Sequence, residues 1–180
     1  MGDDVSDMPD PIKGLALSCI ISDTLEFRSP TTTRRDREVA ERLAKDLKID
    51  VSDYASKLFR AKSDVSDFSD AQLLRMDSKK YPVADLMFRV SVLETTEPDM
   101  IFRRKSSLIE AMGTVCAEDS VDHVLFFVVD ILREESTLFV PNKSVKKVAE
   151  KSFDVNVSDN SVLLPGVVSR KKQIIPNLKI

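Results

Sequence analysis

The chain has 180 residues, of which 42% are hydrophobic and 32% are charged, and its formal net charge at pH 7 is −3. These values are typical of one globular domain, or of one domain with part of another, and they exclude a disordered chain. The small negative charge also excludes a general basic field for nucleic acid or anionic membrane, so an anion site must be local.

The sequence carries no signal for a membrane or for export. No apolar run approaches the roughly 20 residues that a membrane-spanning helix needs, and the acidic, polar start of the chain is unlike a signal peptide. Cys19 and Cys116 each lie within an apolar helical pattern, so we interpret them as buried, reduced thiols. We therefore expect a cytoplasmic protein that binds neither nucleic acid nor membrane.

The first part of the chain is predicted to be helical and incomplete. Residues 1–11 are acidic and contain two prolines, so a disordered lead-in is expected there. The apolar run Gly14–Ile21 contains several small residues and predicts a tightly packed helix. Burying that helix needs more partner surface than the neighbouring residues provide.

A second helix is predicted from Thr33, because its spacing to Asp36 matches a capping box. Apolar residues then recur every four positions as far as Leu47, which makes this helix amphipathic. The polar segment 62–67 is interpreted as the main linker, so that residues 12–62 and 63–180 form two parts.

The second part is predicted to alternate strands and helices. Val124–Val129 is fully apolar and of strand length, as expected for a central strand that is covered on both faces. The other expected elements are a helix capped by Ser69, a strand over 83–93, one long helix from Pro98 to Glu118, a strand over 136–140, a helix over 144–153 and a strand over 161–168. This order predicts an α/β domain in which helices lie on the faces of a mixed sheet.

The segment Gly166–Pro176 is the strongest candidate for chemistry. Arg170, Lys171 and Lys172 stand in a row between two apolar runs, and no acidic residue occurs from Leu163 to the end of the sequence. The flanking apolar residues are expected to hold this backbone, and an oriented Arg beside a Lys suits a small, highly charged anion. On composition alone, a solvated basic loop is the commoner alternative.

Other polar residues carry weaker signals. His123 is the only histidine and adjoins an apolar strand, which favours a structural role. Asp23 ends an apolar run and Lys79 follows Asp77 and Ser78, so a turn carboxylate and a solvated lysine are their simplest interpretations. The sequence contains neither a glycine-rich phosphate loop nor a nucleophile paired with histidine.

Five stretches, taken in order, resemble the C-terminal part of the family II, manganese-dependent inorganic pyrophosphatases of the DHH phosphoesterase superfamily. The resemblance covers nearly the whole chain from about residue 12, and its sharpest piece is the Ser-Arg-Lys-Lys-Gln run. The stretches are Gly14–Leu25, Ser29–Thr33, Met76–Lys79, Val129–Leu132 and Gly166–Gln173.

The resemblance implies a fold and a set of site residues. It makes residues 12–62 the helical end of the DHH catalytic domain, and residues 63–180 the DHH-associated domain that binds substrate. Asp23 matches the family's last carboxylate metal ligand, while Lys79, Arg170 and Lys171 match the cations that grip pyrophosphate. The implied cofactor is a pair of Mn²⁺ ions (or Co²⁺ or Mg²⁺) that activates a water for hydrolysis of pyrophosphate to two phosphates.

The sequence also departs from the family. The His-x-Asp-x-Asp and Asp-His-His motifs, which would supply most metal ligands, are absent. We therefore expect a fragment, or a protein that has lost its first half, which is inactive by itself. The resemblance implies a homodimer for the intact enzyme, and we expect this chain to be a monomer or a weak dimer. Two alternatives stay open: a non-catalytic module that binds phosphate or pyrophosphate, and an exopolyphosphatase that acts on short chains.

Overall fold

The structure is a computed structural model, and it describes residues 8–180. The chain divides into two compact units, residues 1–62 and residues 63–180. Within the described residues no helix is long and apolar enough to cross a membrane.

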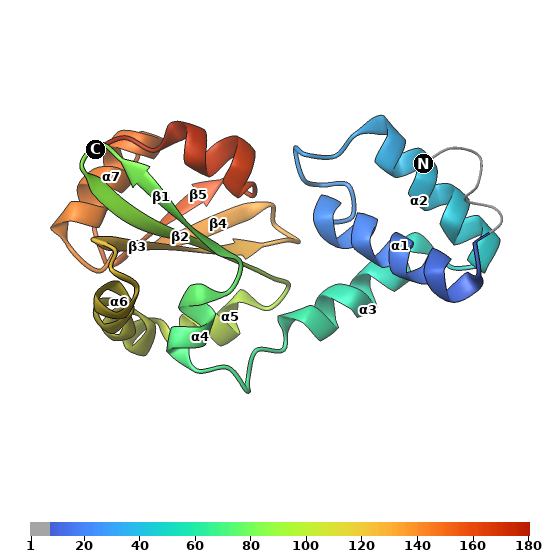
Figure 1. The fold of residues 1–180 in the computed structure, drawn as a ribbon, viewed down its shortest axis with the longest axis horizontal. Coiled ribbons are helices and arrows are strands. Elements are labelled where there is room, and N and C mark those ends of the chain that lie inside the picture. Colours follow the sequence, from blue (N-terminus) through green and yellow to red (C-terminus); the bar gives the residue numbers. More distant parts are fainter. Residues whose placement is uncertain (1–7) are drawn as a thin grey trace. The chain divides into compact units, whose positions relative to one another are not determined.

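The first unit consists of α1 (Asp10–Thr24), α2 (Arg34–Leu47) and most of α3 (Val51–Ser63) (Figure 1). The predicted capping box of α2 is confirmed. The Thr33 hydroxyl accepts the Asp36 N–H at 3.3 Å, and Asp36 Oδ2 accepts the Thr33 N–H at 2.8 Å.

Residues 1–11 were predicted to be a disordered lead-in, and this prediction is wrong for its last two residues, because α1 begins at Asp10. Pro11 is compatible with this start, since a proline in the first helical turn removes an N–H that has no intrahelical partner. The rest of that prediction falls mostly on residues 1–7, which lie outside the described part of the chain.

The second unit is built on a five-stranded sheet in the order β1-β2-β3-β4-β5. Only β2 and β3 run parallel, and the other neighbours are antiparallel. The predicted α/β class with a mixed sheet is thus confirmed. The strands are β1 (Ser78–Val83), β2 (Leu86–Thr95), β3 (His123–Asp130), β4 (Glu135–Phe139) and β5 (Ser161–Pro165).

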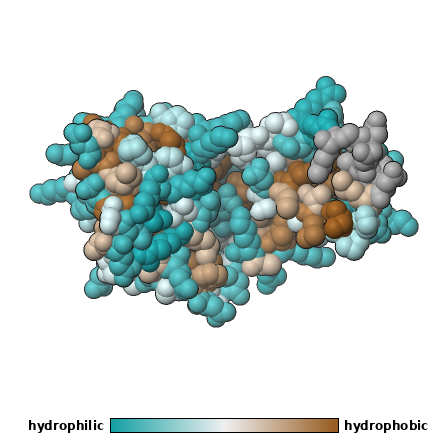
Figure 2. Space-filling view, in the orientation of Figure 1, coloured by the Kyte–Doolittle hydropathy of each residue, from teal (hydrophilic) through white to brown (hydrophobic). Residues whose placement is uncertain are grey.

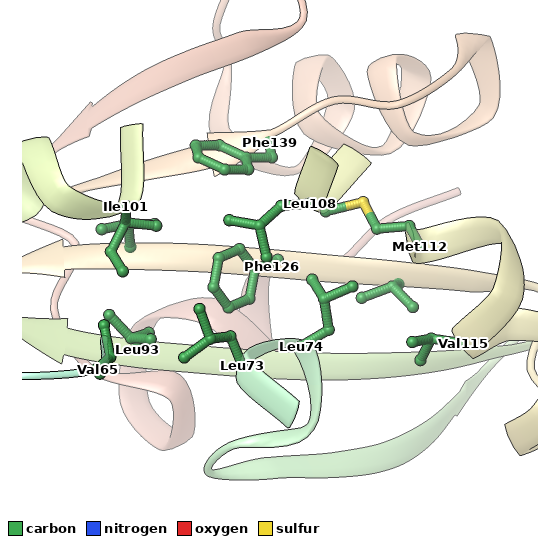
Figure 3. Close-up of a cluster of buried hydrophobic side chains, with 12 residues drawn as sticks. Val65, Leu73, Leu74, Leu93, Ile101, Leu108, Met112, Val115, Phe126 and Phe139 are labelled. Atoms are coloured by element: carbon green, nitrogen blue, oxygen red, sulfur yellow. The ribbon is translucent and has the colours of Figure 1, made fainter. Parts of the chain in front are cut away.

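Helices cover both faces of this sheet, with α4, α5 and α6 on one side and α7 on the other (Figure 1). The side of α4 to α6 holds a cluster of buried apolar residues centred on Phe126 of β3 (Figure 3). On the opposite side, the ring of Phe127 lies 6.0 Å from that of Phe153 in α7. The remaining helices are α4 (Asp70–Arg75), α5 (Pro98–Phe102), α6 (Lys105–Asp119), α7 (Lys143–Phe153), η2 (Arg170–Ile174) and η3 (Ile175–Asn177).

Two of the predicted elements are each divided into two shorter elements in the structure. The single strand expected over 83–93 is the hairpin of β1 and β2, whose turn puts Ala84 in the left-handed region without the glycine or asparagine that marks such turns. The long helix from Pro98 is interrupted at Arg103 and Arg104, where the Arg104 guanidinium donates to the Phe68 carbonyl at 2.8 Å.

Three smaller expectations also need correction. The last strand ends at Pro165 rather than at 168, and Gly166 turns the chain with φ +73°. The linker expected over 62–67 is packed in part, since Val65 is buried and the Ser63 hydroxyl accepts the Thr96 N–H at 2.8 Å. Cys19 is exposed rather than buried, because it lies on a face of α1 that no described residue covers.

An ion-pair network at the end of α6 gives the second unit a pH-dependent stability. The Asp119 carboxylate lies 3.1 Å from Arg75 Nε and 2.8 Å from Arg89 Nε. Burial raises the pKa of Asp119, but hydrogen bonds from Arg75 and the charge of Arg89 outweigh it and lower that pKa below the usual value. A carboxyl group with a lowered folded-state pKa stabilises the fold above its unfolded pKa of about 3.9, and this contribution is lost as the pH falls.

We therefore expect Asp119→Asn to lower the free energy of unfolding by roughly 1–3 kcal/mol at pH 7. The difference from the parent should shrink at pH 3, below the unfolded pKa, because protonation of the unfolded chain begins to remove this contribution there. Urea denaturation at both pH values measures it, with the exposed Glu110→Gln in the same helix as the control. An equal difference at pH 3 and pH 7 would contradict the assignment.

Candidate functional site

The ends of the strands bring the candidate residues of the second unit to one edge of the sheet. Thr95, at the end of β2, pairs with Asp130, which pairs with Glu135, which pairs in turn with Pro165 at the end of β5. The segments after β2, β3 and β5 and the segment before β1 therefore leave from the same edge. Sheets of this kind bind ligands beyond the carboxyl ends of their parallel strands.

The basic segment is fixed by the side chain of Gln173. Its Oε1 accepts the N–H groups of Val168 and Ser169 at 3.0 and 2.9 Å, and its Nε2 donates to the Gly166 carbonyl at 2.6 Å. Gly166 itself donates its N–H to the Glu134 carbonyl at 2.9 Å. The sequence indicated Gln173 only as one residue of the basic motif. In the structure its side chain holds the turn that follows β5.

The short π-helix η2 then sets the direction of Arg170 and Lys171. The Ser169 hydroxyl accepts the Lys172 N–H at 3.4 Å at the start of this helix, and Ile174 at its end is fully buried. Val168 on the other side is also buried. The two cations therefore project from a backbone that is anchored at both ends, which a freely solvated basic loop would not show.

Arg170 contacts the segment that precedes β1. Its guanidinium donates to the Asp77 carbonyl and, from Nη2, to Asp77 Oδ1 at 2.9 Å. The Arg170 side chain is 15% exposed, whereas that of Asp77 is 61% exposed. Arg170 is thus held in one orientation by a carboxylate that solvent reaches.

Lys79 lies close to this contact, on the same face of the sheet. It is two residues from Asp77, a spacing of about 6.6 Å along a strand. Lys79 pairs with Val90, and Val90 pairs with Leu125. Leu125 precedes Phe126 in β3 and therefore points to the opposite face, so Lys79 lies on the α7 face of the sheet. The C-terminal segment that contains η2 lies on that same α7 side (Figure 1).

Two of the three candidate cations are exposed. The side chains of Lys79 and Lys171 make no hydrogen bond or ion pair with any residue that the structure describes. Lys171 follows Arg170 directly in η2. The second unit therefore presents one anchored guanidinium, with an exposed ammonium group beside it in the chain and another beside its Asp77 partner.

Asp23 lies in the first unit, in the last turn of α1, and is exposed. After it, three consecutive residues from Leu25 to Phe27 have left-handed backbones, with φ of 51°, 53° and 68°. Thr24 supports this turn, because its hydroxyl donates to the Ile20 carbonyl at 2.7 Å and accepts the Phe27 N–H at 3.2 Å. Left-handed residues other than glycine cost roughly 1 kcal/mol each, and such strain concentrates at functional sites.

The described residues do not fit a metal pair by themselves. No group of three or more His, Cys, Asp or Glu side chains that could hold a metal ion is found among residues 8–180. Asp23 offers a single carboxylate, whereas each divalent ion takes about four to six ligands. We therefore derive no catalytic step through a metal from this chain.

Comparison with known proteins agrees with this architecture. The DHHA2 domain matches residues 56–180. The chain is 35% identical over 173 residues to a probable manganese-dependent inorganic pyrophosphatase of Lactobacillus helveticus, covering 96% of this chain and 56% of the relative. It is 41% identical over 170 residues to the protein of the same description from Deinococcus radiodurans, covering 92% of this chain and 54% of the relative.

A solved structure gives the same result. The crystal structure of a putative family II inorganic pyrophosphatase from Methanococcus jannaschii superposes with a TM-score of 0.83 and 32% identity, over 94% of this chain and 55% of that chain. This chain thus spans just over half the length of the relatives it matches. The resemblance predicted from sequence motifs is confirmed, and the chain belongs to the DHHA2 domain family.

Proposed function

We propose that this chain forms the substrate-gripping part of a manganese-dependent inorganic pyrophosphatase. The observation that carries the proposal is the Arg170 guanidinium, oriented by Asp77 at the sheet edge where Lys79 and Lys171 remain exposed. In this assignment residues 12–62 are the end of the DHH catalytic domain, and residues 63–180 bind substrate. Cytoplasmic location and a homodimer of the intact enzyme stay predictions.

The charges of the second unit suit pyrophosphate. Arg170 can turn its planar set of donors from Asp77 to two phosphate oxygens, while Lys79 and Lys171 supply mobile point charges. Positioned cations of this kind stabilise the negative charge that moves onto the leaving phosphate. The reaction divides pyrophosphate and one water into two phosphates.

The metal site of the complete enzyme requires more ligands than the one carboxylate that Asp23 offers among the described residues. The relatives' names state manganese dependence, and we extend it to the complete protein with Asp23 as one ligand. When bound, a two-metal site supplies an activated water. The remaining ligands must come from outside the described residues.

A second candidate function follows from that missing ligand set. A chain with the anchored Arg170 but without a metal site could bind phosphate or pyrophosphate without chemistry, as a regulatory module. In that case the purified chain should bind imidodiphosphate without added metal, and Lys171→Ala should weaken the heat of binding. No heat at any metal concentration would leave the module without support.

A chimera tests the catalytic proposal. The matched segment of the Lactobacillus helveticus relative is replaced by this whole chain, and phosphate release is measured with Mn²⁺. We expect hydrolysis by the chimera, no turnover above background by the chain alone, and loss of the chimera's activity on Asp23→Asn.

Three outcomes would count against this assignment. A folded chimera without activity, or a chain that turns over alone at the chimera's rate, would contradict it. A preference of the chimera for longer phosphate chains would favour the exopolyphosphatase alternative instead.

A further inference from the structure

Asp77 brings a negative charge to the candidate cations of the second unit. Its Oδ1 accepts a hydrogen bond from Arg170 Nη2 at 2.9 Å. Among residues 8–180 no other carboxylate lies within ion-pair distance of Arg170, Lys79 or Lys171. A carboxylate thus occupies the donors with which the proposed function requires Arg170 to bind an anion.

Two different groups of Asp77 hold the Arg170 guanidinium. The Asp77 carbonyl accepts a hydrogen bond from Arg170 Nη1, and it also accepts the Val92 N–H of β2 at 3.4 Å. The carboxylate belongs to a side chain that is 61% exposed, and hydrophilic residues predominate over the second unit in the view of Figure 2. The carbonyl therefore positions the guanidinium, whereas the carboxylate mainly adds a charge that solvent reaches.

The backbone of Asp77 indicates which substitution separates these two effects. Asp77 lies between the end of α4 at Arg75 and the start of β1 at Ser78, and its φ of 37° is in the left-handed region. Most residues avoid that region, but aspartate and asparagine tolerate it because their short polar side chains hydrogen-bond locally. Asparagine therefore removes the charge while it keeps the side-chain shape, one acceptor oxygen and the backbone conformation.

We propose that Asp77 competes with the anion for Arg170, so that its charge lowers the anion affinity of this site. This inference rests on the proposed function and concerns the same site. A phosphate group that binds in a bidentate manner needs the two donors that Asp77 holds. The anion must therefore displace the carboxylate or bind beside it against electrostatic repulsion.

The competition acts on the product as well as on the substrate. Orthophosphate is a single phosphoryl group, so it can contact fewer of Arg170, Lys79 and Lys171 at once than pyrophosphate can. A carboxylate that weakens both anions by the same factor leaves pyrophosphate bound at concentrations at which orthophosphate dissociates. Asp77 is thus a positioning residue that acts through Arg170 and assists product release.

A purely structural role for Asp77 predicts the opposite sign. If the carboxylate only oriented the guanidinium for the anion, removal of its charge would loosen Arg170 and weaken binding. If the carboxylate competes with the anion, removal of its charge strengthens binding. Because the carboxylate is exposed and solvent screens it, the expected change in affinity is about fivefold.

Titration calorimetry with imidodiphosphate distinguishes the two roles, because it measures binding rather than turnover. In the chimera with the Lactobacillus helveticus portion, Asp77→Asn should lower the Kd for imidodiphosphate by about fivefold. Asp85→Asn is the matched control, since it removes the same charge from an exposed residue in the turn at the other end of β1. Its Kd should stay within about twofold of the parent, and both variants should melt within about 4 °C of the parent.

A double-variant cycle shows whether the effect passes through Arg170. In the Arg170→Ala background, Asp77→Asn should change the Kd by less than about twofold, because the group for which the carboxylate competes is absent. In the active chimera, Asp77→Asn should lower the KM for pyrophosphate and the inhibition constant for orthophosphate, each by about fivefold, without raising kcat.

The outcomes separate this inference from the proposed function. An Asp77→Asn chimera that binds imidodiphosphate no more tightly than the parent would overturn the inference. A gain that persists in the Arg170→Ala background would also overturn it, because the charge would then act on the site as a whole. Tighter binding in a chimera that does not hydrolyse pyrophosphate would support the competition and contradict the catalytic proposal alone. A folded chimera that binds imidodiphosphate in no variant would contradict both.

Discussion

Replacing Phe126 with alanine is expected to lower the free energy of unfolding of the second unit by about 3–5 kcal/mol. Phe126 is fully buried in the central strand β3, and its ring lies 5.7 Å from that of Phe139 (Figure 3). Leu73 and Leu74 of α4 and Leu108 of α6 are also fully buried in this cluster. The cavity cannot collapse easily, because it opens between a sheet and helices that are each fixed by other contacts.

This loss is a large part of the 5–15 kcal/mol that usually stabilises a domain. Urea denaturation followed by circular dichroism measures it, since the chain has no tryptophan. Leu163→Ala, on the edge strand β5 and half exposed, is the control and should cost less than about 1 kcal/mol. A loss below about 1.5 kcal/mol for Phe126→Ala would mean that this cluster is not the centre of the core.

Local signals predicted the elements that depend on neighbouring residues. The capping boxes at Thr33 and Ser69 form as expected, because each joins residues three apart in sequence. The apolar run of β3 likewise predicted a strand that is covered on both faces, and the strand is buried along nearly its whole length. In these cases the sequence next to the element determines its conformation.

Elements that depend on distant contacts were mispredicted. The break before α6 coincides with Arg104 reaching Phe68 and Asp70, which are more than thirty residues away in sequence. Cys19 was expected to be buried because its neighbours are apolar, yet the covering surface is not among the described residues. Periodicity indicates which residues prefer burial, and it does not reveal whether a partner is present.

The candidate site shows the same division. The charge and apolar flanks of the basic segment indicated an anchored Arg170, and the structure holds that backbone through buried Val168 and Ile174. The contact of Arg170 with Asp77 joins positions 93 residues apart in sequence, so no local sequence pattern could predict it. The roles of Asp23, Lys79, Arg170 and Lys171 stay predictions that variants must test.

Arg170→Ala in the chimera is expected to lower kcat/KM for pyrophosphate by about 100-fold or more, the range found when one preorganised donor to a developing charge is removed. Asp77 holds the guanidinium at the site before the anion binds, so that binding exchanges its hydrogen bonds to Asp77 for hydrogen bonds to phosphate oxygens. Arg170→Lys should give an intermediate loss, because it keeps the charge and loses the planar pair of donors. Phosphate release at varied pyrophosphate concentration measures each variant.

Lys172→Ala is the matched control. Lys172 lies two residues after Arg170 in η2 and carries the same charge, but it does not match one of the family's substrate-binding cations. Its kcat/KM should stay within about threefold of the parent, a change of less than about 0.7 kcal/mol in transition-state stabilisation. Stability must be compared in parallel, because Arg170→Ala also removes two hydrogen bonds to Asp77 and should cost up to about 2 kcal/mol. If Arg170→Ala and Lys172→Ala lower activity equally in folded chimeras, the segment acts only through its net charge. The oriented guanidinium would then have no special part in binding pyrophosphate.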